Sequence, residues 1–140
     1  MTCELCETDG GEILWQNELC RVVLVDDADY PGFCRVILKR HVKEMTDLGK
    51  MGRPHFMAVV LAAEQAVREV MAPDKINLAS LGNVVPHLHW HVIPRFCNDK
   101  HFPNPIWGDA QRAGTPPQID GLADKLRAAF QEALGASFPS

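Results

Sequence analysis

Three histidines alternate with large apolar residues over residues 87–93, which read His-Leu-His-Trp-His-Val-Ile. Successive side chains of a β-strand point to opposite faces, so positions i and i+2 lie about 6.6 Å apart on one face. The pattern therefore predicts a strand that lines one face with His87, His89 and His91 and packs the intervening apolar residues in a core. The alternative is a surface strand that carries three solvated histidines.

The composition is that of an ordinary single globular domain. The 140 residues, of which 46% are apolar and 23% charged, suffice for one domain spanning residues 1–140. No apolar run approaches the ~20 residues that cross a bilayer, and no secretory signal opens the chain, so we expect a cytoplasmic protein without a membrane partner. A net charge of −4 gives no general attraction to nucleic acid.

The hydrophobic pattern predicts an α+β fold. Short apolar or alternating runs predict five strands, at residues 12–16, 20–25, 33–38, 75–81 and 87–93. Helical spacing predicts a long helix from Pro54 to just before Pro73, and a second helix over residues 120–134. The order of these elements predicts a largely antiparallel sheet with one long helix and a C-terminal helix. The core covers about residues 3–107, and an irregular arm and the closing helix cover residues 97–140.

The spacing of the histidines limits what they can do together. A single metal ion cannot take all three, because His87 and His91 lie about 13 Å apart on an extended strand. One histidine can act as a nucleophile through one ring nitrogen while a neighbouring group fixes the tautomer through the other. Imidazole chemistry of this kind suits phosphoryl or nucleotidyl transfer, in which positioning and charge stabilisation supply most of the catalysis.

The stretch from Asn77 to Phe96 closely resembles the histidine-triad (HIT) family of nucleotide hydrolases and transferases. The family motif is His-φ-His-φ-His-φ-φ, with φ hydrophobic, and residues 87–93 match all seven positions. Residues 31–41, Pro-Gly-Phe-Cys-Arg-Val-Ile-Leu-Lys-Arg-His, look like the family's Pro-Gly-His-x-φ-φ-φ-Pro-Lys-x-His. The resemblance implies a homodimeric HIT-like fold that acts on a nucleotide and needs no catalytic cofactor.

The resemblance assigns the catalytic roles to the three histidines. His89 would be the nucleophile that takes up the nucleoside monophosphate. His91 would contact the phosphate and the scissile oxygen or nitrogen, and His87 would hold the hydrogen-bond network behind them.

The resemblance also assigns nucleotide-binding roles. Asn83 would help to place the phosphate or the leaving group, Asn77 would be a second amide on the phosphate side, and Asp26 would bind the ribose. An Asn or Asp beside a turn is also a common backbone cap, which is the alternative for Asn77 and Asp26.

Three positions depart from the family pattern. Phe33 replaces the usual histidine of Pro-Gly-His, and Leu38 replaces the proline before Lys39. Val84 stands where many members carry Ser or Thr facing the leaving group. The loss of that hydroxyl leaves the preference for a leaving group open.

The N-terminal Cys3-x-x-Cys6 gains meaning from the resemblance. A branch of the HIT family binds structural zinc through such a pair together with two histidines, which correspond here to His41 and His87. Two thiolates and two imidazoles suit zinc. The alternatives are a frayed N-terminus with two free thiols and a redox motif, although redox motifs usually open a helix after a strand.

The remaining cysteines, histidines and tryptophans suggest simpler roles. Cys20 and Cys34 lie in apolar strands and are expected in the core, and His55 and His101 are expected at the surface. Trp107 lies in the arm, which in HIT dimers reaches toward the active site of the partner, so we expect Trp107 to pack there.

Three functions therefore stay open at this stage. The first is a nucleotide hydrolase or nucleotidyl transferase with His89 as covalent catalyst, acting on a phosphoanhydride or phosphoramidate. The second is a metal-dependent hydrolase that uses triad histidines as ligands, although no HExxH-like pattern supplies the rest of such a site. The third is a nucleotide-binding module without turnover.

Overall fold

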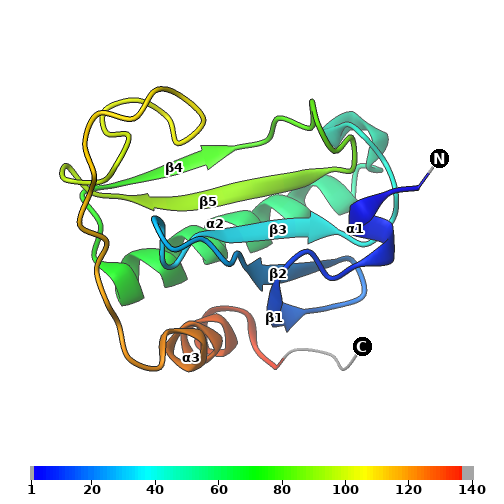
Figure 1. The fold of residues 1–140 in the computed structure, drawn as a ribbon. Coiled ribbons are helices and arrows are strands. Elements are labelled where there is room, and N and C mark those ends of the chain that lie inside the picture. The colour runs from blue at the N-terminus through cyan, green and yellow to red at the C-terminus, as the bar shows by residue number, and fades with distance from the viewer. Residues whose placement is uncertain (1, 137–140) are drawn as a thin grey trace.

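A five-stranded sheet forms the centre of the computed structural model, which describes residues 2–136 (Figure 1). The sheet order is β1-β2-β3-β5-β4, and every neighbouring pair is antiparallel. The strands are β1 (Glu12–Gln16), β2 (Cys20–Leu24), β3 (Cys34–Leu38), β4 (Lys75–Ala79) and β5 (His89–Arg95). The helices are α1 (Glu4–Glu7), the short 3-10 helix η1 (Met45–Asp47), α2 (Gly52–Met71) and α3 (Leu122–Leu134). The predicted α+β class and antiparallel sheet are confirmed.

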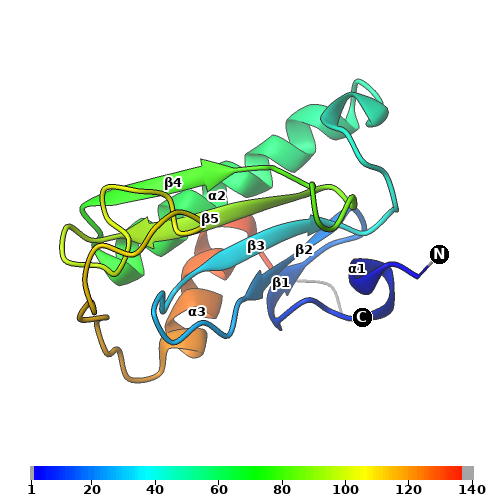
Figure 2. The ribbon, with the colours of Figure 1, turned by 45° about the horizontal axis from the view of Figure 1, so that its top comes forward.

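Two helices cover one face of the sheet, as Figures 1 and 2 show. The long helix α2 buries an apolar stripe that includes Phe56, Val60 and Val67, because these residues recur at helical spacing. The helix ends at Met71, and Ala72 adopts a left-handed conformation just before Pro73. Helix α3 packs beside α2 and over β1. Together these contacts form the main hydrophobic core.

The alternation along β3 and β5 divides their side chains between the two faces of the sheet. Leu88 and Val92 join the core under α2, as the sequence predicted, and Trp90 packs against that core. His89 and His91 therefore point to the opposite face. The helix α1 lies on this face, where Leu5 packs against Ile37.

The structure departs from the predicted row of three imidazoles at His87. Strand β5 begins at His89, and His87 lies in the bend that precedes it. The amide of His87 bonds to the carbonyl of Val85, so the chain turns before it enters the sheet. His87 consequently directs its ring to a different set of partners from His89 and His91.

Several single-residue expectations can also be compared with the structure. Cys20 and Cys34 are fully buried, and burial raises the pKa of each thiol to about 12. His55 is exposed, as expected. His101 is instead half-buried, because its Nδ1 lies 2.6 Å from the hydroxyl of Tyr30. None of the helices in residues 2–136 has the length and apolar character that a membrane crossing requires.

Candidate active site

The antiparallel pair β3–β5 places two histidines on the open face of the sheet. His89 lies opposite Ile37 and His91 lies opposite Arg35 in the strand register. The rings of His89 and His91 meet edge to face, with their centres 4.9 Å apart. Two of the three predicted catalytic histidines are therefore adjacent on one surface.

The hydrogen bonds of His89 fix its tautomer. Its Nδ1 donates to the carbonyl of His87 at 2.5 Å, so the proton resides on Nδ1 and the lone pair on Nε2. The carbonyl of His89 in turn accepts a hydrogen bond from the Ser80 hydroxyl at 2.8 Å. Burial lowers the pKa of His89, and the nearby charge of Arg35 lowers it further, against the opposing effect of the His87 carbonyl. A neutral, oriented imidazole of this kind is suited to nucleophilic attack.

His91 is also neutral near pH 7. Its side chain is 6% exposed, and burial, with the neighbouring His89 and Arg35, lowers its pKa to about 4. The ring lies between two aromatic neighbours, with Phe33 at 5.8 Å and Trp107 at 4.9 Å between ring centres. Its buried Nδ1 has no hydrogen-bond partner within the described part of the chain. His91 therefore offers a polar group that the protein itself does not satisfy.

A cavity of about 420 Å³ opens over these two histidines. Arg35 and Trp107 line it together with the turn at residues 81–85. This turn brings Asn83 to the cavity, and Val84 beside it is 93% exposed. The cavity is of the size that small-molecule sites usually have.

Two predicted nucleotide-binding residues lie outside this cavity. Asn77 on β4 uses its side-chain oxygen to accept a hydrogen bond from Arg95 at 2.8 Å. Asp26 is exposed and lines a different cavity of about 520 Å³, between Gly32 and Leu122. The nucleotide contacts predicted for Asn77 and Asp26 stay predictions. Asn77 lies within β4, and Asp26 lies just after the end of β2.

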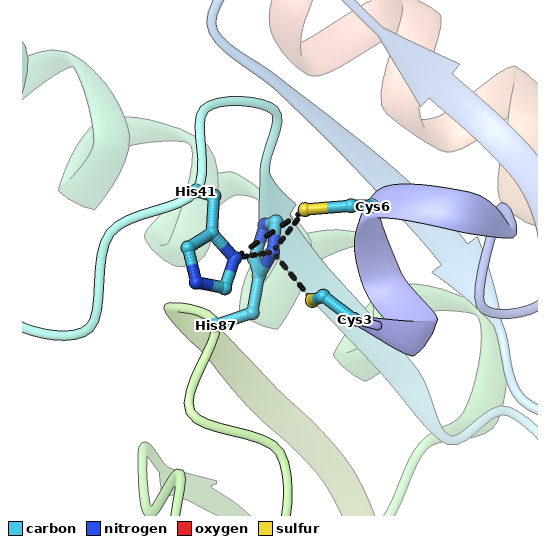
Figure 3. A group of neighbouring side chains, drawn as sticks. All are labelled: Cys3, Cys6, His41 and His87. Atoms are coloured by element: carbon cyan, nitrogen blue, oxygen red, sulfur yellow. Dashed lines mark hydrogen bonds between the residues drawn. The ribbon is translucent and has the colours of Figure 1, made fainter. Parts of the chain in front are cut away.

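A candidate metal centre forms beside the histidine strand, as Figure 3 shows. The ligand atoms of Cys3, Cys6, His41 and His87 all lie within 4.8 Å of one another. The Nδ1 of His87 lies 3.4 Å and 3.5 Å from the two sulfurs and 3.2 Å from the Nδ1 of His41. A tetrahedral zinc ion with these ligands has S–N edges of about 3.5 Å and N–N edges of about 3.3 Å. The four groups therefore have the mutual spacing of zinc ligands.

The second nitrogen of His87 supports the same interpretation. His87 Nε2 donates to the carbonyl of Leu38 at 2.6 Å, which leaves the lone pair of the ring on Nδ1, facing the two cysteines. The ring of His87 therefore lies within this cluster. Its contact with the active-site histidines is the hydrogen bond from His89 to its backbone carbonyl. The network role predicted for His87 stays a prediction; its backbone carbonyl is the group that contacts His89.

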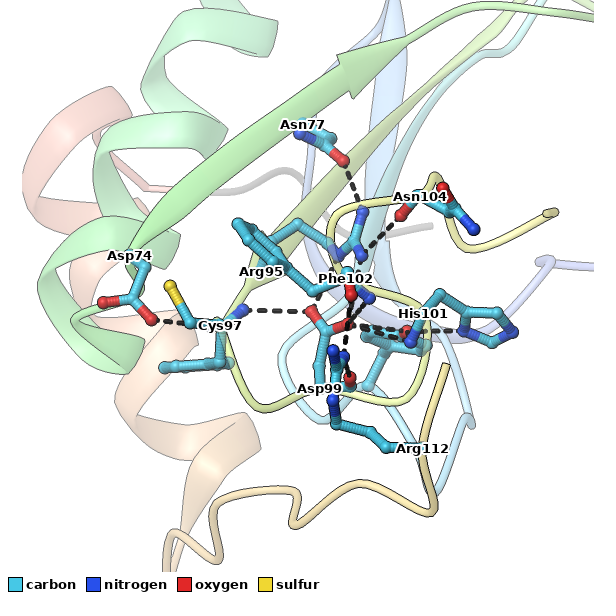
Figure 4. A network of polar contacts seen from close by, with 11 residues as sticks. Asp74, Asn77, Arg95, Cys97, Asp99, His101, Phe102, Asn104 and Arg112 are labelled. Carbon is cyan, nitrogen blue, oxygen red and sulfur yellow. Dashed lines mark hydrogen bonds and ion pairs between the residues drawn. The ribbon is translucent and has the colours of Figure 1, made fainter. Parts of the chain in front are cut away.

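A buried ionic network holds the arm that carries Trp107, as Figure 4 shows. Arg95, at the end of β5, bonds to the carboxylate of Asp99 and to the carbonyl of Asn104. Hydrogen bonds from the amides of Phe96 and Phe102 also reach that carboxylate. Within its own chain Trp107 packs on His91, and its predicted contact with the site of a partner stays a prediction.

Comparisons with known proteins agree with this geometry. A family model described as the HIT domain matches residues 9–98. The chain belongs to the HIT family. The family match supports a nucleotide-processing function in general.

Two solved HIT structures and one curated relative illustrate the similarity. A histidine-triad protein from Bradyrhizobium japonicum superposes with a TM-score of 0.74 at 25% identity, covering 96% of this chain and 97% of that one. A zinc-bound histidine-triad protein from Mycobacterium smegmatis gives a TM-score of 0.66 at 25% identity, covering 94% and 95%. An AP-4-A phosphorylase from Mycobacterium tuberculosis is 31% identical over 106 residues, covering 71% of this chain. This chain spans about half of that relative, 54% of its length.

Two residues of this HIT site were missed by the sequence argument. Arg35 lines the cavity, although it lies in the apolar run Cys-Arg-Val-Ile-Leu. The signal that could have identified Arg35 is its charge within an otherwise apolar strand. Because β3 pairs with β5, that side chain lies on the same face as the histidines. No sequence pattern could have identified Asp99. Its ion pair with Arg95 depends on the path of the irregular arm, which the sequence does not predict.

Proposed function

We propose that this HIT protein is a nucleotide hydrolase or nucleotidyl transferase that forms a covalent nucleotidyl intermediate on His89. The observation that carries the proposal is the hydrogen bond from His89 Nδ1 to the His87 carbonyl. It leaves Nε2 unprotonated beside a cavity large enough for a phosphate group and part of a nucleoside. The substrate would be a nucleoside 5′-phosphate derivative with a phosphoanhydride or phosphoramidate bond.

The reaction would proceed in two displacements at the α-phosphorus. In the first, the lone pair of His89 Nε2 attacks phosphorus, and the bond to the leaving oxygen or nitrogen breaks with its electron pair. In the second, an acceptor oxygen attacks phosphorus, the P–N bond breaks, and the electron pair returns to Nε2 while the acceptor loses its proton. Water as acceptor releases the nucleoside monophosphate. Inorganic phosphate as acceptor releases the nucleoside diphosphate.

The neighbours of His89 support this chemistry. Neutral His91 would donate a hydrogen bond to the phosphate, and its unpartnered nitrogen and low pKa are consistent with a ligand-binding role. Asn83, which lines the same cavity, would bind the phosphate or the leaving group. Ser80 would hold the His89 backbone in place through its hydrogen bond to that residue's carbonyl.

We also propose that the Cys3, Cys6, His41 and His87 cluster holds a structural zinc ion. The spacing of the four ligand atoms, the free lone pair of His87 Nδ1 and the zinc-bound relative support this assignment. When bound, zinc would fasten the N-terminal helix to the bend before β5. The same His87 would then support His89 through its carbonyl, so the metal would act on structure while the imidazole performs the chemistry.

The test is nucleotide release from adenosine phosphoramidate and from diadenosine tetraphosphate, with and without inorganic phosphate. We expect wild type to turn over at least one substrate and His89→Ala to lose turnover by at least ~10³-fold, the scale of losing a catalytic nucleophile. The matched control is His55→Ala, which removes an exposed histidine of α2 and should retain activity. Circular dichroism checks the fold of each variant.

Other outcomes would favour the two competing functions. Turnover that survives in His89→Ala but vanishes when a folded protein is stripped of metal would indicate a metal-dependent hydrolase. Mononucleotide binding without turnover in wild type would indicate a binding module. Homodimerisation and a cytoplasmic location stay predictions; light scattering of the purified protein tests the first.

A further inference from the structure

Arg35 is a charged side chain at the active-site cavity that forms no hydrogen bond and no ion pair within residues 2–136. It lies on β3, points to the same face as the two histidines and is half-buried. Its buried Nε has no hydrogen-bond partner, and within residues 2–136 its guanidinium forms no ion pair. Its guanidinium carbon lies over the ring of Phe33, 5.6 Å from the ring centre, in a cation–π contact. Burial of an unpaired charge is costly, so this arrangement calls for a ligand.

The other buried arginines show that the fold can satisfy such a group. Arg21 lies on the neighbouring strand β2 and donates to three backbone carbonyls, those of Leu5, Thr8 and Asp9. Arg95 bonds to Asp99, Asn77 and Asn104. These two guanidinium groups fasten segments of the chain together. Arg35 differs because its buried Nε has no hydrogen-bond partner among the described residues.

The position of Arg35 indicates the chemistry of that ligand. Arg35 pairs with His91 across the strands, and His91 also has a buried nitrogen without a partner. Burial lowers the pKa of Arg35 and the carboxylate of Glu4 opposes that effect, yet an arginine stays protonated near pH 7. A fixed guanidinium beside a neutral imidazole, both lining one cavity, fits a phosphate group that accepts from both.

We propose that Arg35 binds the phosphate chain of the leaving group and so makes this enzyme select phosphoanhydrides over phosphoramidates. This specificity rests on the proposed function. When His89 Nε2 attacks the α-phosphorus of a dinucleoside polyphosphate, the electron pair of the breaking P–O bond stays on the departing oxygen, which gains a negative charge. A phosphoramidate instead loses ammonia, whose nitrogen takes up a proton and leaves uncharged.

A cation next to the leaving atom therefore favours only the first reaction. Arg35 would stabilise the charge that develops on the bridging oxygen. Val84, which also lines the cavity, has no hydroxyl that could donate to the leaving group, and Asn83 beside it is uncharged. The effect should appear in the preference between substrates.

The first test compares kcat/KM for diadenosine tetraphosphate with kcat/KM for adenosine phosphoramidate. We expect Arg35→Leu to lower the ratio of the two by about 10-fold to 100-fold, the scale of one lost charge-assisted contact, and Arg35→Lys to lower it less. The matched control is Arg68→Leu, which removes an exposed arginine of α2 and should keep the wild-type ratio. Arg35→Leu removes an unpaired buried charge, so its melting temperature should equal or exceed that of wild type. An equal loss with both substrates would overturn the proposal in favour of an α-phosphate contact.

The second test does not depend on turnover. In a His89→Ala background, calorimetry would measure the affinities for AMP and for ADP, with and without Arg35→Leu. We expect the additional phosphate of ADP to improve affinity only when Arg35 is present, and an unchanged ADP-to-AMP ratio would overturn the proposal. A wild type that cleaves neither substrate would contradict the proposed function, whereas the binding ratio would still decide the role of Arg35.

Discussion

Arg95 and Asp99 form a two-pronged ion pair that is almost completely buried. The Nε and one terminal nitrogen of Arg95 lie 2.8 Å and 3.0 Å from the two carboxylate oxygens, with the side chains 2% and 4% exposed. Arg95 also reaches Asn77 on β4 and the carbonyl of Asn104 in the arm. The pair thereby joins the end of the histidine strand to the segment that carries Trp107 (Figure 4).

Asp99→Asn should destabilise the protein strongly. The substitution keeps the size of the side chain but leaves the buried Arg95 charge uncompensated, which typically costs about 3–5 kcal/mol. Chemical denaturation measures the change in the free energy of unfolding. The control is Asp29→Asn, which breaks a 3.5 Å ion pair between partly exposed Asp29 and Lys100 and should cost less than about 1 kcal/mol. Equal effects of the two substitutions would contradict the role assigned to Asp99.

Cys3→Ser and Cys6→Ser should each reduce zinc content and thermal stability together. Each substitution removes one thiolate from a four-ligand set, and metal binding and folding are coupled in such sites. Elemental analysis should find about one zinc per chain in wild type and much less in either variant. Chelation of wild type should lower its melting temperature toward that of the variants.

Cys97→Ser is the control for the zinc prediction. Cys97 is exposed and lies outside the cluster, so its substitution should leave both metal content and melting temperature unchanged. If Cys3→Ser retained a full complement of zinc, the four-ligand assignment would be wrong. If all three cysteine variants lost metal alike, the loss would reflect general instability.

The sheet and its helices could be predicted because each has a local signature. The apolar runs identified β1 to β5, and the spacing of residues such as Val60 and Val67 identified α2. The alternation in residues 89–92 also predicted which side chains face the core, since period-two burial is dictated by strand geometry alone. The positions of these strands and helices are determined by residues close together in the sequence, so a local pattern can predict them.

The parts of the site that the sequence did not predict depend on long-range contacts. The family resemblance implied that His87 joins Cys3 and Cys6, but alternation along the strand predicted that its ring would also lie beside His89 and His91. The bend before β5 separates that ring from the other two, and it depends on contacts with the distant N-terminus. The arm has no hydrophobic periodicity. The sequence therefore could not predict the contact of Trp107 with His91 or the Arg95–Asp99 ion pair that anchors the arm. Asp26 was assigned by its position relative to a motif, and the three-dimensional path of the chain carries it to another cavity.

Trp107 should report nucleotide binding through its fluorescence. Its side chain is 51% exposed, and its ring edge contacts His91 at the mouth of the cavity. A bound nucleotide should therefore change the emission of wild type upon titration with AMP. Trp107→Phe should lose most of this change, although Trp15 and Trp90 remain. Trp107→Ala should also weaken AMP binding about 3-fold to 10-fold, the scale of one lost aromatic contact. A full signal in Trp107→Phe would show that the ligand binds elsewhere.

His91 should make the protein less stable as the pH falls below neutrality. Its folded-state pKa is lowered to about 4, chiefly by burial and then by His89 and Arg35, whereas an unfolded histidine titrates near pH 6.5. Between these values the unfolded chain binds the additional proton. The stability that neutral His91 contributes is therefore complete above about pH 6.5 and is lost as the pH falls toward 4.

The comparison with His91→Gln isolates this contribution. The glutamine variant has no ionisable group at residue 91, while the metal cluster and the other histidines titrate in both proteins. The free energy of unfolding of wild type minus that of the variant should fall with decreasing pH by up to about 1.4 kcal/mol per unit between pH 6.5 and 4. Urea denaturation at several pH values measures this difference. A difference that stays constant over the range would show that His91 keeps an ordinary pKa, and the cavity would then be far better solvated than its 6% exposed side chain indicates.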